Sequence, residues 1–309
     1  MNTLRIFLFG QFRVQCGEEI LTEQYSPKLQ QLFCYLLFFR DRSHSREALA
    51  SLLWGNSSTA QSKKYLRQAL WQLQNSVESR DRGGSWHMLL VDPDRVCLNP
   101  NADLWLDVAV FERAFARTQG IAGATLDSQQ VQALYDAADL YRGDLLEGCY
   151  QDWCLYERER LQNMYLTLLD KLMDYCEAHN KCEIGLDFGA RILRYDGARE
   201  RTHRRLMRLY YLTGDRTAAL RQYDHCVRAL RKELAVKPAA RTVTLYQLIR
   251  TDRFPGPTQS PLTGSIPHPS SSPQWPEMVE QLRHLQRSLA RVQDELQGAI
   301  HAAETAMTD

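Results

Sequence analysis

The sequence lacks any long apolar run. Its longest candidate, Leu29 to Phe39, is about half as long as the roughly 20 residues that a membrane-spanning helix needs. The start of the chain, MNTLRIFLFGQFRV, has no basic leader and no small-residue cleavage site, and it alternates like a β-strand. We therefore expect no membrane span, no export signal and no membrane partner.

Closely spaced cysteine pairs are also missing. The eight cysteines, at positions 16, 34, 97, 149, 154, 176, 182 and 226, include no CxxC, and several stand at positions that the hydrophobic pattern predicts to be buried. Disulfides are rare in cytosolic proteins, and structural zinc sites usually need such pairs. The pattern therefore predicts a reduced, cytoplasmic protein without a zinc site.

The motifs of several enzyme classes are absent as well. The sequence has no GxxxxGK[ST] phosphate loop, no HExxH, no GxSxG and no His/Cys cluster with metal-ligand spacing. The eight histidines stand apart, so we interpret His87, His203 and His225 as surface or packing residues. We expect no cofactor, no metal and no enzymatic activity.

Charge is nearly balanced, with a net value of +1 for the 309 residues. In residues 1–100, however, Lys and Arg outnumber Asp and Glu by 12 to 9, and this segment contains the stretch Ser62 to Glu78, SKKYLRQALWQLQNSVE. Apolar residues recur there at helical spacing and predict a helix docked on a core. They are Leu66, Leu70, Leu73 and Val77.

The opposite side of this predicted helix is polar, with one indole and no carboxylate before Glu78. It carries Lys64, Arg67, Gln68, Trp71, Gln72 and Asn75. Cations neutralise phosphates, and Arg, Asn and Gln pair bidentately with base edges in a major groove. By itself the pattern fits an ordinary solvated surface helix as well as a DNA-contacting helix. The flanking sequence distinguishes the two interpretations.

The flanking sequence predicts two helices before this one, short strands before them and a hairpin after it. Strands are expected over residues 4–14, with a break at Gly10, and again at residues 20–21. Ser26-Pro27 and Ser45 are predicted helix starts. Residues 86–91 and 95–98 flank an Asp-Pro-Asp turn and predict a hairpin. This order is typical of a winged helix-turn-helix.

Three motifs extend this prediction: Ser26-Pro27-Lys28, then Arg46 to Leu49 with Leu53-Trp54, then Leu66 to Leu70. They resemble the OmpR-type winged helix of the SARP family of bacterial activators. The resemblance implies base or phosphate contacts from the third helix, a minor-groove contact from Arg95 at the wing and a phosphate contact from Lys28. The residues implied on the third helix are Lys63, Lys64, Arg67, Gln68, Trp71 and Gln72.

Two of these residues have alternatives. Trp71 could instead contact a partner protein or pack against the wing. Lys63 lies toward the flank of the predicted helix and could be merely solvated. Arg67 and Gln68 are the stronger candidates.

The second half of the chain carries an internal repeat. Residues 172–181 align with residues 206–215 at an offset of 34, and Asn180-Lys181 falls under Gly214-Asp215. Asn and Gly are the residues that best tolerate a left-handed helix stop. A helix-turn-helix period of 34 residues is typical of tetratricopeptide repeats.

This region also resembles the bacterial transcriptional activator domain that follows the winged helix in the SARP family. The motifs that carry the resemblance are Leu140 to Leu146, Asp152-Trp153, Glu157 to Leu161, Leu206 to Tyr210, Gly214 to Leu220 and Leu230 to Leu234. Gly185 and Asn180 depart from the usual Ala and Gly. The resemblance implies RNA polymerase as a partner.

Arginines crowd the segment from Arg191 to Arg208. Four of them are candidates for a small anionic or nucleotide effector site: Arg201, Arg204, Arg205 and Arg208. Because Asp187, Asp196 and Glu200 lie nearby in the sequence, we favour the alternative that these are salt-bridged, solvated helices.

The C-terminal part predicts a tether and a coiled coil. Residues 254–276 are rich in Pro and Ser and predict a disordered linker. From Met278 onward apolar residues follow heptad spacing, with Leu282, Leu285, Leu289, Val292 and Leu296 as the expected oligomer contact. The alternative is a helix that packs on its own domain.

We therefore predict a mainly α protein with small β elements. Its parts are a winged helix-turn-helix domain (1–100), a tetratricopeptide-like activator domain (101–253), the linker (254–276) and a coiled-coil helix (277–309). The function predicted is a cytoplasmic, sequence-specific DNA-binding activator that binds promoter DNA as a dimer or higher oligomer, at direct repeats as readily as at palindromes. The alternative is a helical-repeat adaptor whose winged helix binds protein.

Overall fold

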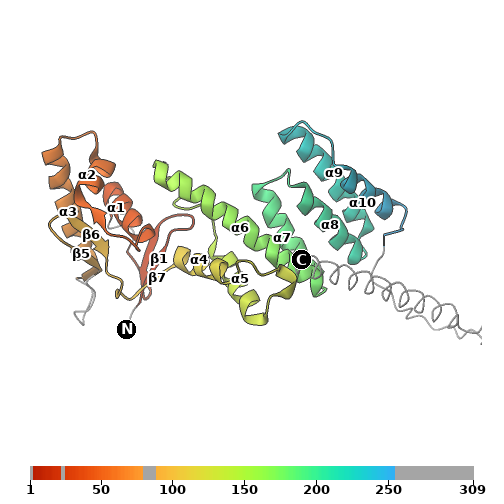
Figure 1. Cartoon of the computed structure of the whole chain (residues 1–309), viewed down its shortest axis with the longest axis horizontal. Helices are drawn as coiled ribbons and strands as arrows, with labels where there is room; N and C mark the ends of the chain where they lie inside the picture. Colours follow the sequence, from red (N-terminus) through yellow and green to blue (C-terminus); the bar gives the residue numbers. More distant parts are fainter. Residues whose placement is uncertain (1–2, 22–24, 79–87, 255–309) are drawn as a thin grey trace, which may run out of the picture. The chain divides into compact units, whose positions relative to one another are not determined.

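The computed structural model describes residues 3–21, 25–78 and 88–254 (Figure 1). These residues belong to one compact unit of the chain, Met1–Pro257. The predicted linker, apart from Phe254, and the predicted coiled-coil helix with its Leu and Val contacts lie outside the described residues.

The chain begins with a four-stranded sheet of order β3-β2-β1-β7. The strands are β1 (Leu4–Phe7), β2 (Arg13–Cys16), β3 (Glu19–Ile20) and β7 (Leu104–Leu106). Leu4 and Ile6 point into the core while Arg5 is exposed, which is the alternation expected for a half-buried strand. The first three strands are where the sequence predicts them. β7 was not predicted, and it pairs in parallel with β1.

Three helices and a second sheet complete the winged helix. The helices are α1 (Pro27–Phe38), α2 (Arg46–Trp54) and α3 (Thr59–Glu78). β4 (His44–Ser45), β5 (Leu89–Val91) and β6 (Arg95–Leu98) form a three-stranded sheet of order β4-β6-β5. The predicted hairpin is therefore present over its described part, and the short strand between α1 and α2 joins it.

Local chemistry explains where these helices start. Pro27 is the first residue of α1, as predicted, and Ser26 stands at its N-cap without forming a side-chain capping bond. Ser45 Oγ accepts from the Ala48 backbone N–H at 3.5 Å and caps α2. α3 begins at Thr59, three residues before the stretch Ser62 to Glu78, with Ser58 Oγ accepting from the Gln61 N–H at 3.4 Å.

The segment after the wing connects the winged helix to the helical region that follows it. α4 (Asp107–Arg117) follows β7 directly, and α5 (Ser128–Leu140) follows the short 3-10 helix η2 (Gly123–Thr125). Asp127 and Gln130 form a capping box at the start of α5. Asp107 is the first residue of α4, and its carboxylate accepts a hydrogen bond from the N–H of Leu8, the residue after β1.

The loop before α6 is bonded to the first sheet. The Leu146 N–H donates to the Leu8 carbonyl, and the Glu147 N–H donates to the Gly10 carbonyl, each at 2.8 Å. The Trp153 ring packs against three aromatic rings at the end of α1 and just beyond it, Tyr35, Phe38 and Phe39, at centroid distances of 5.3, 6.1 and 5.7 Å. The winged helix and the helical region therefore share one hydrophobic core.

The remaining helices stack in sequence order (Figure 1). They are α6 (Asp152–Ala178), α7 (Cys182–Tyr195), α8 (Glu200–Leu212), α9 (Arg216–Glu233) and α10 (Ala240–Arg250). The predicted left-handed stops are confirmed: Asn180 has φ 56° and Gly214 has φ 84°. After each of them the next N–H bonds back across the turn, Lys181 to Cys176 and Asp215 to Tyr210, both at 2.9 Å. The predicted fold class is confirmed.

Candidate nucleic-acid interface

Helix α3 has one face in the core and one face in solvent. On the inner face Leu66, Ala69, Leu70 and Leu73 are buried, as the helical spacing predicts. The side chain of Ser62 is also buried, and its hydroxyl donates to the Trp54 carbonyl at 2.8 Å. These contacts hold α3 against α2 and fix which side of the helix faces outward.

The outer face of α3 presents every side chain that the sequence analysis named for it. All of these residues are exposed: Lys63, Lys64, Arg67, Gln68, Trp71, Gln72 and Asn75. Trp71 is 63% exposed, which is far more than an indole with a packing role would be. The indole of Trp71 is therefore largely open to solvent.

The cationic side chains on the outer face of α3 differ in whether a carboxylate of the protein pairs with them. The Lys63 ammonium lies 3.2 Å from Glu47 on α2, so this lysine sits at the flank of the face. No carboxylate among the described residues lies within ion-pairing distance of Lys64 or Arg67. Those two cations are therefore available to an external anion, which makes them better phosphate ligands than Lys63.

Lys28 and Arg95 lie outside α3. Lys28 is exposed in the first turn of α1. Arg95 is exposed at the start of β6, where its Nε donates to Ser43 Oγ at 2.9 Å and its Nη2 to the Ser43 carbonyl at 3.3 Å. Its guanidinium is thus anchored to Ser43, the residue before β4, so reaching a minor groove would require exchange of these bonds.

Two residues near this surface were not predicted. Tyr65 is 38% exposed on α3, and its ring lies 6.1 Å from that of Trp54. The Arg46 guanidinium donates to the Asp92 carbonyl at 3.0 Å and joins the start of α2 to the wing turn. Helical spacing could have placed Tyr65 beside Gln68, but no local signal connects residue 46 with residue 92.

The four arginines proposed for an effector lie on α8 and are largely paired with carboxylates of α6. Arg205 is 4% exposed, and its three nitrogens lie 2.7 to 2.8 Å from Asp170, Asp174 and Glu177. Arg208 pairs with Glu177 at 3.0 Å, and Arg204 with Glu200 at 3.7 Å. Arg201, which is 59% exposed, makes only long contacts of 3.7 and 4.0 Å.

These arginines nevertheless line a hollow of about 320 Å³. Arg241 of α10 joins them, so five guanidinium groups face two carboxylates there, those of Asp174 and Glu177. Arg241 lies 33 residues beyond Arg208 in the sequence and was not among the predicted residues.

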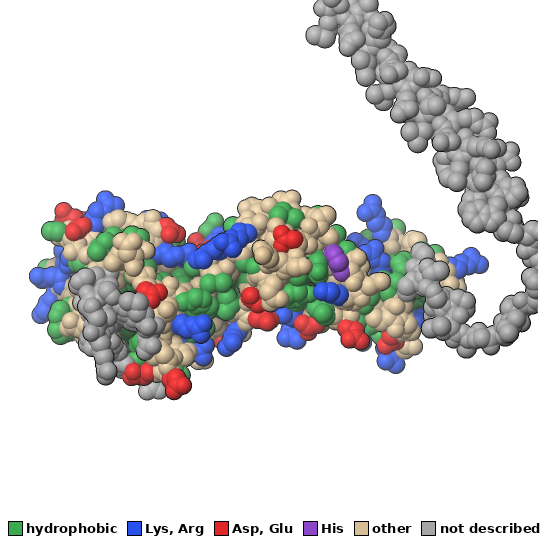
Figure 2. Space-filling view, turned by 90° about the horizontal axis from the view of Figure 1, so that it is seen from below, with side chains coloured by type: hydrophobic (Ala, Val, Ile, Leu, Met, Phe, Trp, Pro, Cys, Tyr) green, Lys and Arg blue, Asp and Glu red, His purple; other side chains and the backbone are tan. Residues whose placement is uncertain are grey.

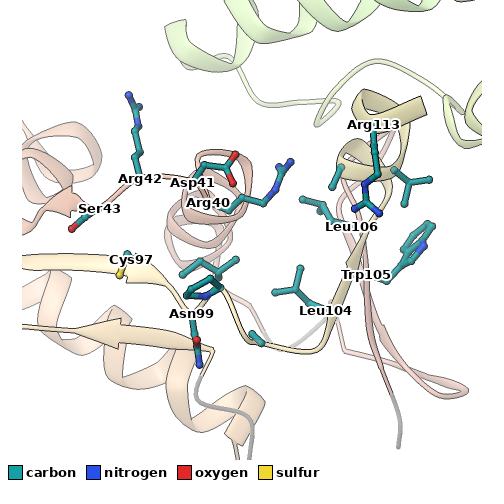
Figure 3. A pocket seen from close by; sticks show the side chains of 15 residues that line it. Arg40, Asp41, Arg42, Ser43, Cys97, Asn99, Leu104, Trp105, Leu106 and Arg113 are labelled. Atoms are coloured by element: carbon teal, nitrogen blue, oxygen red, sulfur yellow. The ribbon is translucent and has the colours of Figure 1, made fainter. Parts of the chain in front are cut away.

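A larger hollow of about 740 Å³ lies between the end of α1, β6, β7 and α4 (Figure 3). Arg40 is anchored there by Glu112 at 3.4 Å, and the Arg42 guanidinium lies 4.3 Å from the Phe39 ring centre. Arg113 has no carboxylate partner among the described residues.

On the face seen in Figure 2, Lys and Arg side chains are spread along the described chain and are not gathered into one patch.

Two further findings concern the described residues. No helix there is long and apolar enough to cross a membrane. Within the same part of the chain, no group of three or more His, Cys, Asp or Glu residues is arranged to hold a metal ion.

Comparison with known proteins adds to this geometry. Residues 106–250 match the family of the bacterial transcriptional activator domain. Among solved structures, Mycobacterium tuberculosis EmbR in complex with a low affinity phosphopeptide is similar, with 17% identity and a TM-score of 0.60. The match covers 82% of this chain and 66% of the EmbR chain, slightly less than two thirds of it. No characterised protein sequence matches the chain significantly.

The fold is a winged helix-turn-helix followed by a helical-repeat domain. Its helical-repeat part, residues 106–250, matches the bacterial transcriptional activator domain that its motifs resemble.

Proposed function

We propose that this chain is a cytoplasmic, non-enzymatic transcription activator that binds promoter DNA through α3. The observation that carries the proposal is the outer face of α3, where Lys64, Arg67, Gln68, Gln72 and Asn75 are all exposed. An α-helix fits the width of a major groove, and these side chains are the types that pair with phosphates and base edges.

The elements around α3 support a DNA-facing orientation of its outer face. α2 packs behind the helix, and the wing turn is joined to the start of α2 through Arg46. In a winged helix-turn-helix the wing lies beside the groove that the recognition helix enters. Lys28 on α1 and Arg95 on β6 would add phosphate or minor-groove contacts at the edges of the site.

The oligomeric state follows from the C-terminal heptads, which lie outside the described residues. We propose that Leu282, Leu285, Leu289, Val292 and Leu296 join two or more copies, with a further contribution from the helical-repeat domain. The tether of residues 254–276 would not impose two-fold symmetry on the DNA-binding parts, so direct repeats are accommodated as readily as palindromes. Removal of residues 277–309 should lower the mass of the oligomer in solution, and an unchanged mass would contradict the assignment.

Two further partners belong to the same proposal. The helical-repeat domain would contact RNA polymerase, because stacked helix pairs present extended surfaces for protein binding. A small anionic or nucleotide effector would occupy the hollow lined by Arg201, Arg204, Arg205, Arg208 and Arg241, where guanidinium groups outnumber carboxylates. Calorimetric titration with ATP as the probe should show binding that weakens in the double variant Arg201→Ala/Arg208→Ala.

Selection of genomic DNA fragments by the full-length protein at physiological salt tests the central claim. We expect enrichment of one sequence motif, and loss of that enrichment in the double variant Arg67→Ala/Gln68→Ala. Both side chains are exposed, so the variant should fold like the parent protein. Failure of the folded protein to enrich any motif would overturn the proposal and favour the adaptor alternative, in which the winged helix binds protein.

A further inference from the structure

The hollow of about 740 Å³ between the end of α1, β6, β7 and α4 combines cationic and apolar side chains. Its volume falls within the range of roughly 300–1,000 Å³ that is typical of small-molecule sites in proteins. Arg40, Arg42 and Arg113 line it, and Asp41 is the one carboxylate among its described lining residues. The lining therefore carries a net charge of +2, from three cations and one anion.

Leucine and valine side chains form an apolar wall on one side of this hollow. Leu98 at the end of β6 and Leu106 at the end of β7 are buried, while Leu104 and Val110 are only half-buried. Figure 3 shows Leu104 and Leu106 on one side of β7 and Trp105 on the other, as the alternation along a strand requires. The half-buried side chains leave apolar area that a ligand in the hollow would cover.

One of the three arginines is already engaged by aromatic residues of the winged helix. The Arg42 guanidinium donates to the Tyr35 hydroxyl at 3.3 Å and lies 4.3 Å from the Phe39 ring centre. In Figure 3 its side chain points away from the leucines of β7. Arg42 therefore belongs to the end of α1 more than to the hollow.

Arg40 and Arg113 have donors available to a ligand. Arg40 reaches α4 through Nη2, which lies 3.4 Å from Glu112. Glu112 lies closer to Arg160, at 2.6 Å, so its charge is shared between two guanidinium groups. Arg113, the next residue on α4, is exposed, and among the described residues no carboxylate lies within ion-pairing distance of it. Guanidinium groups of this kind match the geometry of an incoming carboxylate.

The apolar wall and the two arginines suit different parts of one ligand. An inorganic anion or a DNA phosphate would leave the apolar wall uncovered. A neutral hydrocarbon would leave Arg40 and Arg113 without a counterion. A molecule with an apolar body and a single anionic head satisfies both, which is the usual composition of a small-molecule site.

We propose that this hollow binds an amphiphilic carboxylate of the fatty-acid type. Its carboxylate pairs with Arg40 and Arg113, and its apolar body covers Leu104 and Val110. The lining residues come from the winged helix and from α4, so a bound ligand would connect these two parts of the chain. The inference depends neither on DNA binding by α3 nor on the hollow beside α8.

Calorimetric titration of the full-length protein with octanoate tests the proposal, with octanol and inorganic phosphate as partial ligands. We expect saturable binding of octanoate. Octanol lacks the charge and phosphate lacks the apolar body, so each should bind about tenfold more weakly or worse. The absence of saturable octanoate binding, or binding of octanol or phosphate as tight as that of octanoate, would overturn the proposal.

Four variants of α4 locate the binding. Arg113→Met should weaken octanoate binding about tenfold, because it removes one of the two paired cations. The matched control Arg117→Met removes an exposed arginine from the last turn of the same helix, outside the hollow, and should leave the affinity unchanged. Ala109→Leu should block the hollow and abolish binding, whereas Ala116→Leu, at an exposed position, should not. Equal affinities within either pair would contradict the site.

A second measurement needs no variant. A photoreactive octanoate with a diazirine in its chain should label peptides from residues 97–113 of the parent protein, and excess octanoate should suppress the labelling. Labelling concentrated elsewhere, such as at the exposed Leu234 and Val236 after α9, would overturn the proposal. A loss of DNA affinity in Arg113→Met without any octanoate binding would also overturn it, and would assign this arginine to a DNA phosphate.

Discussion

The carboxylate of Asp107 accepts hydrogen bonds from the Leu8 backbone N–H, at 2.8 Å to one oxygen and 3.0 Å to the other. The same carboxylate accepts from the N–H groups of Phe9 at 2.9 Å and Val108 at 2.7 Å, and the residue is 1% exposed. Leu8 follows β1 and Asp107 opens α4, 99 positions later. A side chain of α4, the first helix after the wing, therefore supplies the acceptor for the backbone N–H groups that follow β1.

Replacement of Asp107 should strongly destabilise the described unit. Asp107→Ala leaves the Leu8 and Phe9 N–H groups buried without an acceptor, and each such loss costs about 1–3 kcal/mol. We expect the free energy of unfolding to fall by about 3 kcal/mol in urea denaturation. Asp103→Ala is the control, because Asp103 is exposed and accepts only a 3.3 Å bond from Thr3, so its loss should change stability by less than about 0.5 kcal/mol.

The outer face of α3 should divide into residues that read sequence and residues that bind phosphate. Arg67→Ala or Gln68→Ala should weaken binding to the selected DNA site by about 1–3 kcal/mol and relax its specificity. Lys64→Ala should weaken binding to all sequences and reduce the slope of log K against log salt by about 1. Fluorescence anisotropy over a range of salt concentrations measures both effects.

A matched control is Arg231→Ala on α9, which removes an equally exposed arginine far along the chain from α3. We expect it to leave affinity and salt slope unchanged. An equal loss of DNA affinity in Arg67→Ala and Arg231→Ala would show that the net charge of the protein, and not the outer face of α3, governs binding.

Arg205 should be far more important for stability than its neighbours on α8. It is buried and holds Asp170, Asp174 and Glu177 of α6, so Arg205→Met leaves three carboxylates without their common cation. Breaking a buried pair in this way costs about 3–5 kcal/mol. Arg201→Ala should cost less than about 1 kcal/mol, because Arg201 is 59% exposed and its pairs are long. Thermal unfolding followed by circular dichroism compares the stabilities of the two variants. An equal loss of stability in both would contradict a dominant role for the ion pairs of Arg205.

The helical repeats should lose stability in mild acid through His203. Burial lowers the pKa of this imidazole below its ordinary value of 6.5, with His225 adding to the effect and Gly197, Glu200 and Asp196 opposing it. The unfolded chain therefore takes up a proton before the folded protein does, and the stabilisation present above pH 6.5 is lost as the pH falls through that value. Nε2 lies 2.8 Å from the Gly197 carbonyl and Nδ1 lies 2.7 Å from the Gln222 amide, which fits a neutral ring.

Melting temperatures measured between about pH 7.5 and 5.5 test this sign. His203→Gln should flatten the profile relative to the parent protein, whereas His225→Gln, at an exposed position, should leave it nearly unchanged. A parent protein that becomes more stable as the pH falls through this range would contradict the assignment.

Local sequence signals predicted the parts of the fold that are decided locally. The spacing of Leu66, Leu70 and Leu73 is sufficient to orient α3, because a helix with one apolar stripe has one way to dock. Asn180 and Gly214 mark helix stops because few other residues adopt a left-handed backbone. The exposure of the α3 outer face follows from the same periodicity.

Pairings between distant segments were not predictable. The sequence offered Asp187 and Glu200 as partners of the α8 arginines, but the main partners of Arg205 lie on α6, about one repeat earlier. Stacking brings equivalent turns of neighbouring repeats together, so residues about 30 positions apart become neighbours. Likewise, nothing local connects a three-residue strand at Leu104 with β1, since a parallel pairing is set by the tertiary arrangement.

The parallel pairing of β7 with β1 has a practical consequence for recombining proteins of this fold. A fragment that stops at residue 100 would leave β1 as an open sheet edge, without β7 and without the acid at 107 that closes it. Gene fusions that exchange the winged-helix half should therefore carry the donor sequence through the end of α4 at Arg117. Chimeras joined there keep β7, the Asp107 carboxylate and α3 together in one transferable segment.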